Sequence, residues 1–400
     1  MKGRNLMVVQ GGGPTQVLNS TLAAVVDEAR ATRGFERVLG ARGGTKGLVE
    51  GSVADLSRLP SRELELLRTS PGAALGSSRF KPSTEDMARI VEQLQRMRVG
   101  HVLFIGGNGT MRGAELLLEY CRKTGCEVQV LGLPKTVDND IAGTDRCPGY
   151  ASAARYVAQS TRDLGMDLRS LPQPMTILET MGRGVGWLAA AAALGKRDEA
   201  DAPHLLYLPE APFEMESFIS AVEDAIAKHG WAVVVVSEGI CYADGRMVYQ
   251  KLDPRQADPL NRPLTGGVGQ YLADEIAAHL GIRCRCEKPG LLGRASALHA
   301  SCQDRKDAEL VGRAGVRGLL ENRTSQMVSL LPLHGAGKAG YTFVELHEAA
   351  GIERQIPAEW VDKGAIPVKP KFFEYLQPLA GSLIPYHAPI SSELDFHGDA

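Results

Sequence analysis

The chain has 400 residues, of which 44% are hydrophobic and 23% charged, and its formal net charge is −2. This composition is typical of a globular protein with two or three α/β lobes, and it excludes the broad basic surface of a protein that binds nucleic acid or membranes. No apolar run approaches the length of a membrane span, and the apolar stretch 6–9 is too short for a signal peptide. We therefore expect a cytoplasmic protein, whose seven cysteines are reduced thiols.

Two strand–turn–helix units precede residue 125. An apolar strand over 6–9 leads into the glycine turn Gly11-Gly12-Gly13, and a second strand over 101–105 leads into the turn 106–110. A glycine-rich turn before a helix presents bare backbone N–H groups and the positive end of the helix dipole to an anion. Each turn alone is equally compatible with a plain tight connection.

A third strand, 128–131, leads into the polar stretch 134–140. This stretch carries one cation, Lys135, and two carboxylates, Asp138 and Asp140. A lysine can neutralise phosphate oxygens, and a carboxylate can take a proton from a substrate hydroxyl or hold a metal ion. At the carboxyl end of a strand, where open α/β sheets bind ligands, this combination favours phosphoryl transfer over a polar loop with an Asn-Asp turn.

Further strands and helices alternate through the second half of the chain. Strands are expected at 175–179, 204–208 and 232–236, and helices at 149–164, 213–227, 268–280 and 304–320. Strands that alternate with helices predict parallel sheets. The fold class is therefore α/β, with two Rossmann-like three-layer lobes, mostly parallel sheets and a C-terminal extension.

In their order along the chain, these motifs resemble the A-type phosphofructokinase family, and in particular its pyrophosphate-dependent branch. The resemblance rests on Gly12-Gly13, on Arg79 within 76–80, on 106–110, on 134–140, on 179–183, on Ser237-Glu238, and on Arg285 with Arg294. It implies a donor lobe at 1–147 completed by a segment near 263–305, a sugar-phosphate lobe at 148–262, and a C-terminal helix and extension at 306–400. It also implies a homodimer or homotetramer.

The resemblance implies transfer of a phosphoryl group, with Mg²⁺, to the 1-hydroxyl of fructose 6-phosphate. Asp138 would be the base, Lys135 and Arg183 would complete the catalytic set, and Asn108 and Asp140 would hold the metal ion. The acceptor ligands would be Thr136, Asp140, Met181, Gly182, Arg183, Glu238, Arg294 and Arg285, the last reaching in from a neighbouring subunit. The donor ligands would be Gly12, Gly13, Arg79, Gly107, Asn108, Gly109 and Thr110.

The phosphoryl donor remains open, because Lys135 and Gly109 indicate different donors. Lys135 is typical of pyrophosphate users, but those enzymes carry aspartate where this chain has Gly109. Asn108 replaces the aspartate that the family uses as a metal ligand, and an amide attracts the ion less strongly. We predict pyrophosphate as the donor, with an ATP-dependent 6-phosphofructokinase as the alternative.

The acceptor is the second open point. Pro174 and Leu291 occupy positions where the family places a basic residue and a His or Tyr, both for the 6-phosphate. Each lost charged hydrogen bond would weaken binding by ~1.5–3 kcal/mol unless Lys288 or Arg169 compensates. The alternatives are a kinase for a different sugar or sugar phosphate and, because of Asn108, a non-catalytic regulatory subunit.

Overall fold

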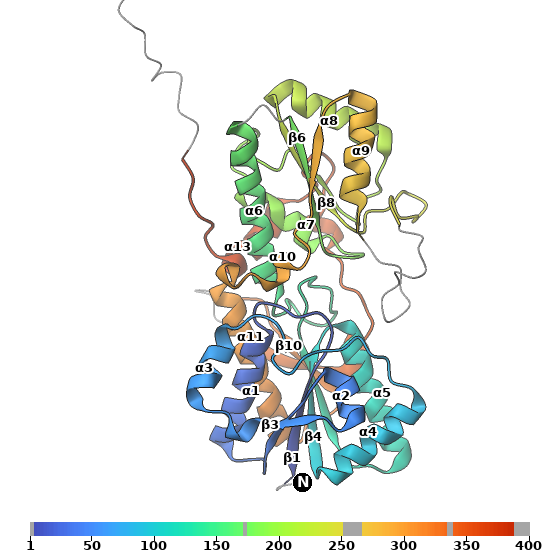
Figure 1. Cartoon of the computed structure of the whole chain (residues 1–400), viewed down its shortest axis with the longest axis vertical. Coiled ribbons are helices and arrows are strands. Elements are labelled where there is room, and N and C mark those ends of the chain that lie inside the picture. Colours follow the sequence, from blue (N-terminus) through green and yellow to red (C-terminus); the bar gives the residue numbers. More distant parts are fainter. Residues whose placement is uncertain (1–3, 171–173, 251–265, 334–338, 388–400) are drawn as a thin grey trace, which may run out of the picture.

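The structure is a computed structural model that describes residues 4–170, 174–250, 266–333 and 339–387. It consists of two α/β lobes stacked along the long axis of the molecule, and each lobe is a sheet with helices on both faces (Figure 1). The predicted fold class, with two three-layer lobes and mostly parallel sheets, is confirmed. Within the described ranges, no helix has the length and apolar character needed to cross a membrane.

The first lobe contains a seven-stranded sheet in the order β11-β10-β5-β4-β1-β2-β3. Its strands run parallel from β10 to β2, and each edge strand is antiparallel to its neighbour. The strands with predicted polar ends, β1, β4 and β5, are adjacent, so their carboxyl ends meet at one edge. The bounds are β1 (Asn5–Gln10), β2 (Val38–Ala41), β3 (Val53–Asp55), β4 (Val99–Gly106), β5 (Gln129–Pro134), β10 (Gln326–Leu330) and β11 (Tyr341–Glu345).

Both faces of this sheet are covered because apolar side chains alternate between them. Leu6 and Val8 of β1 face one buried cluster, whereas Met7 and Val9 face another. The first cluster is closed by α1 (Leu18–Thr32), α3 (Ser61–Thr69) and α11 (Cys302–Leu320). The second is closed by α2 (Gly44–Glu50), α4 (Thr84–Arg96), α5 (Asn108–Thr124) and α12 (Leu346–Ala349).

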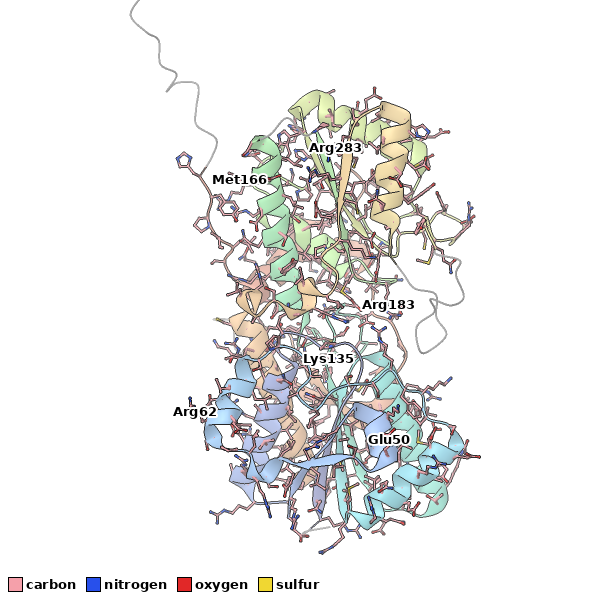
Figure 2. The ribbon with its side chains drawn as sticks, in the orientation of Figure 1. Glu50, Arg62, Lys135, Met166, Arg183 and Arg283 are labelled. Atoms are coloured by element: carbon pink, nitrogen blue, oxygen red, sulfur yellow. The ribbon has the colours of Figure 1, made fainter. Side chains whose placement is uncertain are left out.

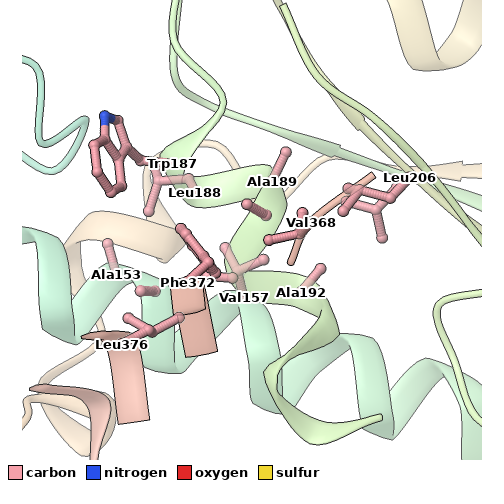
Figure 3. Close-up of a cluster of buried hydrophobic side chains, with 14 of the residues drawn as sticks. Ala153, Val157, Trp187, Leu188, Ala189, Ala192, Leu206, Val368, Phe372 and Leu376 are labelled. Carbon is pink, nitrogen blue, oxygen red and sulfur yellow. The ribbon is translucent and has the colours of Figure 1, made fainter. Parts of the chain in front are cut away.

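The second lobe contains a four-stranded parallel sheet in the order β7-β8-β6-β9. Figure 3 shows one of its clusters, in which Trp187 and Phe372 pack near Val157. The strands are β6 (Met175–Thr180), β7 (Leu205–Tyr207), β8 (Ala232–Ser237) and β9 (Cys284–Glu287). One face is covered by α6 (Tyr150–Ser170), α7 (Trp187–Ala191) and α13 (Pro370–Ala380), and the other by α8 (Met215–His229) and α9 (Val268–Leu280).

The lobes divide the chain differently from the sequence-based boundaries. The segment expected to complete the first lobe, 263–305, instead gives α9 and β9 to the second lobe, because β9 pairs with β6. The first sheet is completed by β10 and β11, which come from the supposed extension. These pairings depend on strand neighbours far apart in the sequence, which local periodicity does not reveal. Of the predicted sugar-phosphate lobe, 148–262, residues 171–173 and 251–262 lie outside the described residues.

Two buried carboxylates of α11 tie the lobes together. Asp304 accepts hydrogen bonds from the backbone N–H groups of Gly149 (2.8 Å) and Ser152 (3.0 Å), at the start of α6. Asp307 binds the buried guanidinium of Arg146 through Nε (2.6 Å) and Nη2 (2.8 Å). A helix of the first lobe therefore fixes both the loop after β5 and the first helix of the second lobe.

We predict that Asp307→Ala lowers the free energy of unfolding by about 3–5 kcal/mol, because it leaves the buried Arg146 without its bidentate partner. Urea unfolding followed by circular dichroism measures this loss. Asp167→Ala, which removes an exposed carboxylate of α6, is the control and should remain near the wild type. A loss below about 1 kcal/mol for Asp307→Ala, the range of an exposed ion pair, would contradict the interpretation.

Candidate active site

The candidate site lies at the junction of the two lobes, because both sheets turn their carboxyl ends toward it. Lys135 follows β5, and Arg183 lies in the loop between β6 and α7. Figure 2 shows both side chains at this junction, one from each lobe. Ligands of open α/β sheets bind at the carboxyl ends of the strands, so two such edges facing each other form a site with two halves.

Lys135 is buried beneath the first glycine turn. Its side chain is 2% exposed, and Nζ donates a hydrogen bond to the carbonyl oxygen of Gly13 at 2.5 Å. Gly12 adopts a φ of +74°, and a Cβ there would lie 3.5 Å from Nζ. Ser77 Oγ donates to the Gly12 carbonyl at 2.6 Å, which brings the segment carrying Arg79 to the same turn.

The second glycine turn opens α5 beside the first. Gly107 precedes the helix, and the Thr110 hydroxyl packs so closely against Gly106 that a Cβ on that glycine would overlap it. The next position, Gly109, would place a Cβ in open space. The backbone N–H groups at this helix start can bind an anion.

Asp138 carries the strongest indication of chemistry. Burial is the main cause that raises the pKa of its carboxyl to about 7, and the negative charges of Asp140 and Glu238 add to it. Arg183 and Lys135 oppose this shift. Asp138 Oδ1 is buried, and no described residue hydrogen-bonds to it. A carboxylate with this pKa can accept a proton near neutral pH.

Lys135 shows the opposite shift. Burial, reinforced by the positive charge of Arg294, lowers the pKa of its ammonium to about 8, while Asp138 and Asp140 hold it up. The lysine therefore remains mostly charged at neutral pH. A buried cation of this kind, next to two glycine turns, can neutralise the oxygens of a phosphoryl group.

The proposed metal ligands are in direct contact. Asn108 Nδ2 donates to the carbonyl oxygen of Asp140 at 3.0 Å and to its Oδ2 at 3.2 Å. Three oxygen atoms are buried and have no hydrogen-bonding partner among the described residues. They are Asn108 Oδ1, Asp140 Oδ1 and Asp138 Oδ1. Oxygen acceptors without donors fit a hard cation such as Mg²⁺, which binds through oxygen and keeps several waters.

The second lobe supplies the loop at the other side of the junction. Arg183 has a φ of 50° and its N–H donates to Glu238 Oε1 at 3.4 Å, while Gly182 has a φ of +145°. The Glu238 N–H donates to the Thr180 carbonyl at 2.9 Å, so the ends of β6 and β8 hold this loop. A pocket adjoins it, lined by Val137, Ala153, Tyr156, Val157, Glu179, Thr180, Met181, Leu188, Pro289, Gly290, Gly293 and Arg294.

Of the two predicted arginines in this region, one lies in the site. Arg294 belongs to the short helix α10 (Leu292–Ala295) and lies against Gly13. A Cβ added to Gly13 would be 2.5 Å from Nη1 of Arg294. Burial lowers its pKa, and Arg79 lowers it further, which places these two cations near each other. Arg285 is instead exposed on the edge strand β9, in register with Thr176 near the start of β6.

Two residues were expected to compensate for the missing ligands of the acceptor's 6-phosphate, and the structure places them at opposite ends of the second sheet. Arg169, near the end of α6, lies over the ring of Trp231 beside the start of β8, at the far edge of the second sheet. It therefore cannot compensate at the site. Lys288 follows β9 and lies at the junction, where its Nζ is 2.7 Å from Glu179 Oε1.

The C-terminal extension contributes contacts that the sequence did not reveal. The Arg354 N–H donates to the Asp140 carbonyl at 2.8 Å, and the Arg354 carbonyl accepts from Trp187 Nε1 at 3.0 Å. Tyr375 of α13 accepts a hydrogen bond from Asn139 Nδ2 at 3.0 Å. The extension thus holds the loop that carries Asp138. The only sequence feature that indicated this role is the length of the chain after α11.

Comparison with known proteins decides the family. A family model for phosphofructokinase matches residues 5–319, which is most of the chain. The chain belongs to the phosphofructokinase family. The matched range contains the glycine turns, the 134–140 stretch and the loop after β6 that carries Arg183.

Individual members of this family resemble the chain over nearly its full length. A pyrophosphate–fructose 6-phosphate 1-phosphotransferase from Rhodospirillum rubrum is 34% identical, over 96% of each chain. A sulfofructose kinase from Alkalicoccus urumqiensis is 33% identical, over 88% of this chain and 91% of that one. The structure of a pyrophosphate-dependent phosphofructokinase from Nitrosospira multiformis superposes with a TM-score of 0.86 at 27% identity, over 97% of this chain and 95% of that one.

The raised pKa of Asp138 has a consequence for stability. Below about pH 4 the group is protonated in both states, but between pH 4 and 7 the folded state binds more protons than the unfolded state. The contribution of this group to stability is therefore lost as pH rises toward 7. We predict that Asp138→Asn unfolds at higher urea than the wild type at pH 8, and that the difference disappears near pH 4.

Urea midpoints measured from pH 4 to 8 test this prediction. Asp167→Asn, at an exposed position of α6, is the matched control and should show no such pH-dependent gain. If Asp138→Asn is no more stable than the wild type at pH 8, burial does not raise the pKa of this carboxyl, and the interpretation is wrong.

Proposed function

We propose that this protein transfers a phosphoryl group from pyrophosphate to the 1-hydroxyl of fructose 6-phosphate, giving fructose 1,6-bisphosphate. The observation that carries the proposal is the pairing of Lys135, buried beneath the Gly12-Gly13 turn, with Asp138, whose pKa is raised to about 7. Lys135 can neutralise the negative charge of a small anionic donor, and Asp138 can act as the base. The names of two of the reported relatives, the enzymes from Rhodospirillum rubrum and Nitrosospira multiformis, support the same reaction.

In the proposed mechanism, the ionised Asp138 takes the proton of the acceptor's 1-hydroxyl. The oxygen of that hydroxyl attacks the terminal phosphorus of pyrophosphate. The bond from phosphorus to the bridging oxygen breaks, and orthophosphate leaves. Lys135 and Arg294 neutralise the oxygens of the donor, together with the backbone N–H groups of the two glycine turns. Arg183 and Glu238 orient the acceptor from the second lobe, so that attack is in line.

We assign Mg²⁺ to the oxygens of Asn108 and Asp140. Both Oδ1 atoms are buried without a hydrogen-bonding partner in the described part of the chain. When bound there, the ion would neutralise negative charge on the donor. Asn108 supplies no charge of its own, so Asp140 carries the electrostatic attraction for the ion.

A second candidate donor, ATP, is favoured by one observation. A Cβ on Gly109 would meet nothing within 4 Å, so the second glycine turn leaves room that a donor larger than pyrophosphate can use. Against this, Lys135 fills the space beneath Gly12. We place pyrophosphate first because the lysine is fixed by its buried hydrogen bond.

We further propose that the protein acts in the cytoplasm as a homodimer or homotetramer. Arg285 supports the assembly, since it is exposed on the edge strand β9 and does not reach the site of its own chain. A neighbouring subunit would bring it to the acceptor.

Initial rates with pyrophosphate and with ATP, each with fructose 6-phosphate and Mg²⁺, test the donor. We predict that kcat/KM for pyrophosphate exceeds that for ATP at least tenfold, and that turnover stops when Mg²⁺ is removed. Gly109→Asp should lower ATP use further with little effect on pyrophosphate, because the added side chain has room. An enzyme that turns over with ATP but not with pyrophosphate would contradict the proposal.

The pH dependence of kcat/KM tests the proposed base and cation. Asp138 must be ionised and Lys135 protonated, so we predict a bell-shaped profile with an acidic limb near pH 7 and an alkaline limb near pH 8. Asp138→Asn should lower kcat by ~10²–10⁴-fold. An acidic limb near pH 4 would show that this carboxylate is not the base.

A further inference from the structure

A short segment of the C-terminal extension, residues 353–356, contacts both loops that carry the proposed reactive groups. In this segment, here called the strap, Glu353 forms an antiparallel bridge with Ile141, directly after Asp140. The Arg354 N–H donates to the Asp140 carbonyl at 2.8 Å. The strap connects α12, which packs on the first lobe, to the part of the extension that ends in α13 on the second lobe. Its first two residues are therefore fixed to the loop of the base.

The strap is also fixed to the loop between β6 and α7 of the second lobe. Glu210 accepts hydrogen bonds through Oε1 from the N–H groups of Gly186 (2.9 Å), in that loop, and of Ile356 (3.2 Å), in the strap. Trp187, the first residue of α7, donates from Nε1 to the Arg354 carbonyl at 3.0 Å. One short segment thus holds the two halves of the site by hydrogen bonds.

The side chain of Arg354 connects the same two loops a second time. Its guanidinium carbon lies 4.4 Å from the centre of the fully buried Trp187 ring, which is a cation–π contact. Burial raises the pKa of Tyr375 to about 12, and the positive charge of Arg354 opposes this rise, so the guanidinium lies near the Tyr375 hydroxyl. That hydroxyl accepts a hydrogen bond from Asn139 at 3.0 Å, and Asn139 adjoins Asp138.

Stability alone does not require a cation at position 354. Nη1 of Arg354 is buried and has no hydrogen-bonding partner in the described ranges. A buried donor without a partner destabilises a fold, and an apolar side chain over the same ring would avoid that loss. We therefore expect the guanidinium to serve the reaction.

We propose that Arg354 is a positioning residue that sets the acceptor, oriented by the second lobe, against the base of the first lobe. This inference rests on the proposed function, because it takes Arg183 to orient the acceptor and Asp138 to be the base. The donor side has its own support, since Lys135 is fixed by its hydrogen bond to the Gly13 carbonyl. Loss of the Arg354 side chain should therefore disturb the alignment of acceptor and base and leave donor binding intact.

Steady-state kinetics of Arg354→Met, with each substrate varied in turn, test the assignment. We expect kcat to fall about tenfold to a hundredfold, because a shift of about 1 Å between reacting groups has an effect of that size. KM for the donor should stay close to that of the wild type. Arg354→Lys, which retains a cation over the Trp187 ring, should recover most of kcat. A merely structural role would lower the urea midpoint and leave kcat of the folded enzyme unchanged.

The double variant of Arg354→Met and Tyr375→Phe tests whether the two side chains act as one unit. We expect its kcat to be close to that of Arg354→Met, because removing the guanidinium already breaks the connection to the loop of the base. Losses in kcat that multiply in the double variant would show that the two residues act independently, and would overturn the proposed connection.

Arg323→Met is the matched control. Its guanidinium carbon also lies 4.4 Å from the centre of an aromatic ring, that of Phe343, but Arg323 precedes β10 at the amino end of the first sheet, away from the site. An unchanged kcat in Arg354→Met would overturn the assignment, as would an equal loss in Arg323→Met. If the wild type uses ATP or another acceptor instead, the proposed function is wrong, whereas a loss of kcat in Arg354→Met with those substrates still supports the role of Arg354.

Discussion

The buried hydrogen bond from Lys135 to the Gly13 carbonyl is the constraint on which the site depends. A lysine taken out of water is stable as a cation only where carboxylates balance it, and here Asp138 and Asp140 do so. The same burial keeps Asp138 from ionising readily, so one desolvated cluster produces both the neutralising cation and the base. Neither group would have its shifted pKa on an exposed loop.

The rest of the fold keeps this cluster in place. Asp304 and Asp307 on α11 anchor the first helix of the second lobe and the loop after β5, respectively. The C-terminal extension holds Asp140 through Arg354. Because these contacts join segments from both lobes, the halves of the site are positioned by buried polar bonds as well as by apolar packing.

The sequence was most informative where the chemistry is local. The glycine turns, Lys135, Asp138 and Asp140 all lie within a few residues of a strand end, so periodicity and residue type located them. It was least informative about contacts between distant segments. Neither the pairing of β9 with β6 nor the approach of Arg354 to Asp140 has a local pattern, and Lys288 lies against Glu179 because of that strand pairing. Arg285 and Arg294 are only nine residues apart, yet the fold separates them.

The central claim is that burial makes Asp138 a base that ionises near neutral pH. Its carboxyl can be titrated directly by carbon-13 NMR of protein labelled at the aspartate side chains, with Asp138→Asn used to assign the resonance. The account predicts a titration midpoint near pH 7 for the resonance missing in the variant. A midpoint near pH 4, the ordinary range of an exposed aspartate, would contradict it.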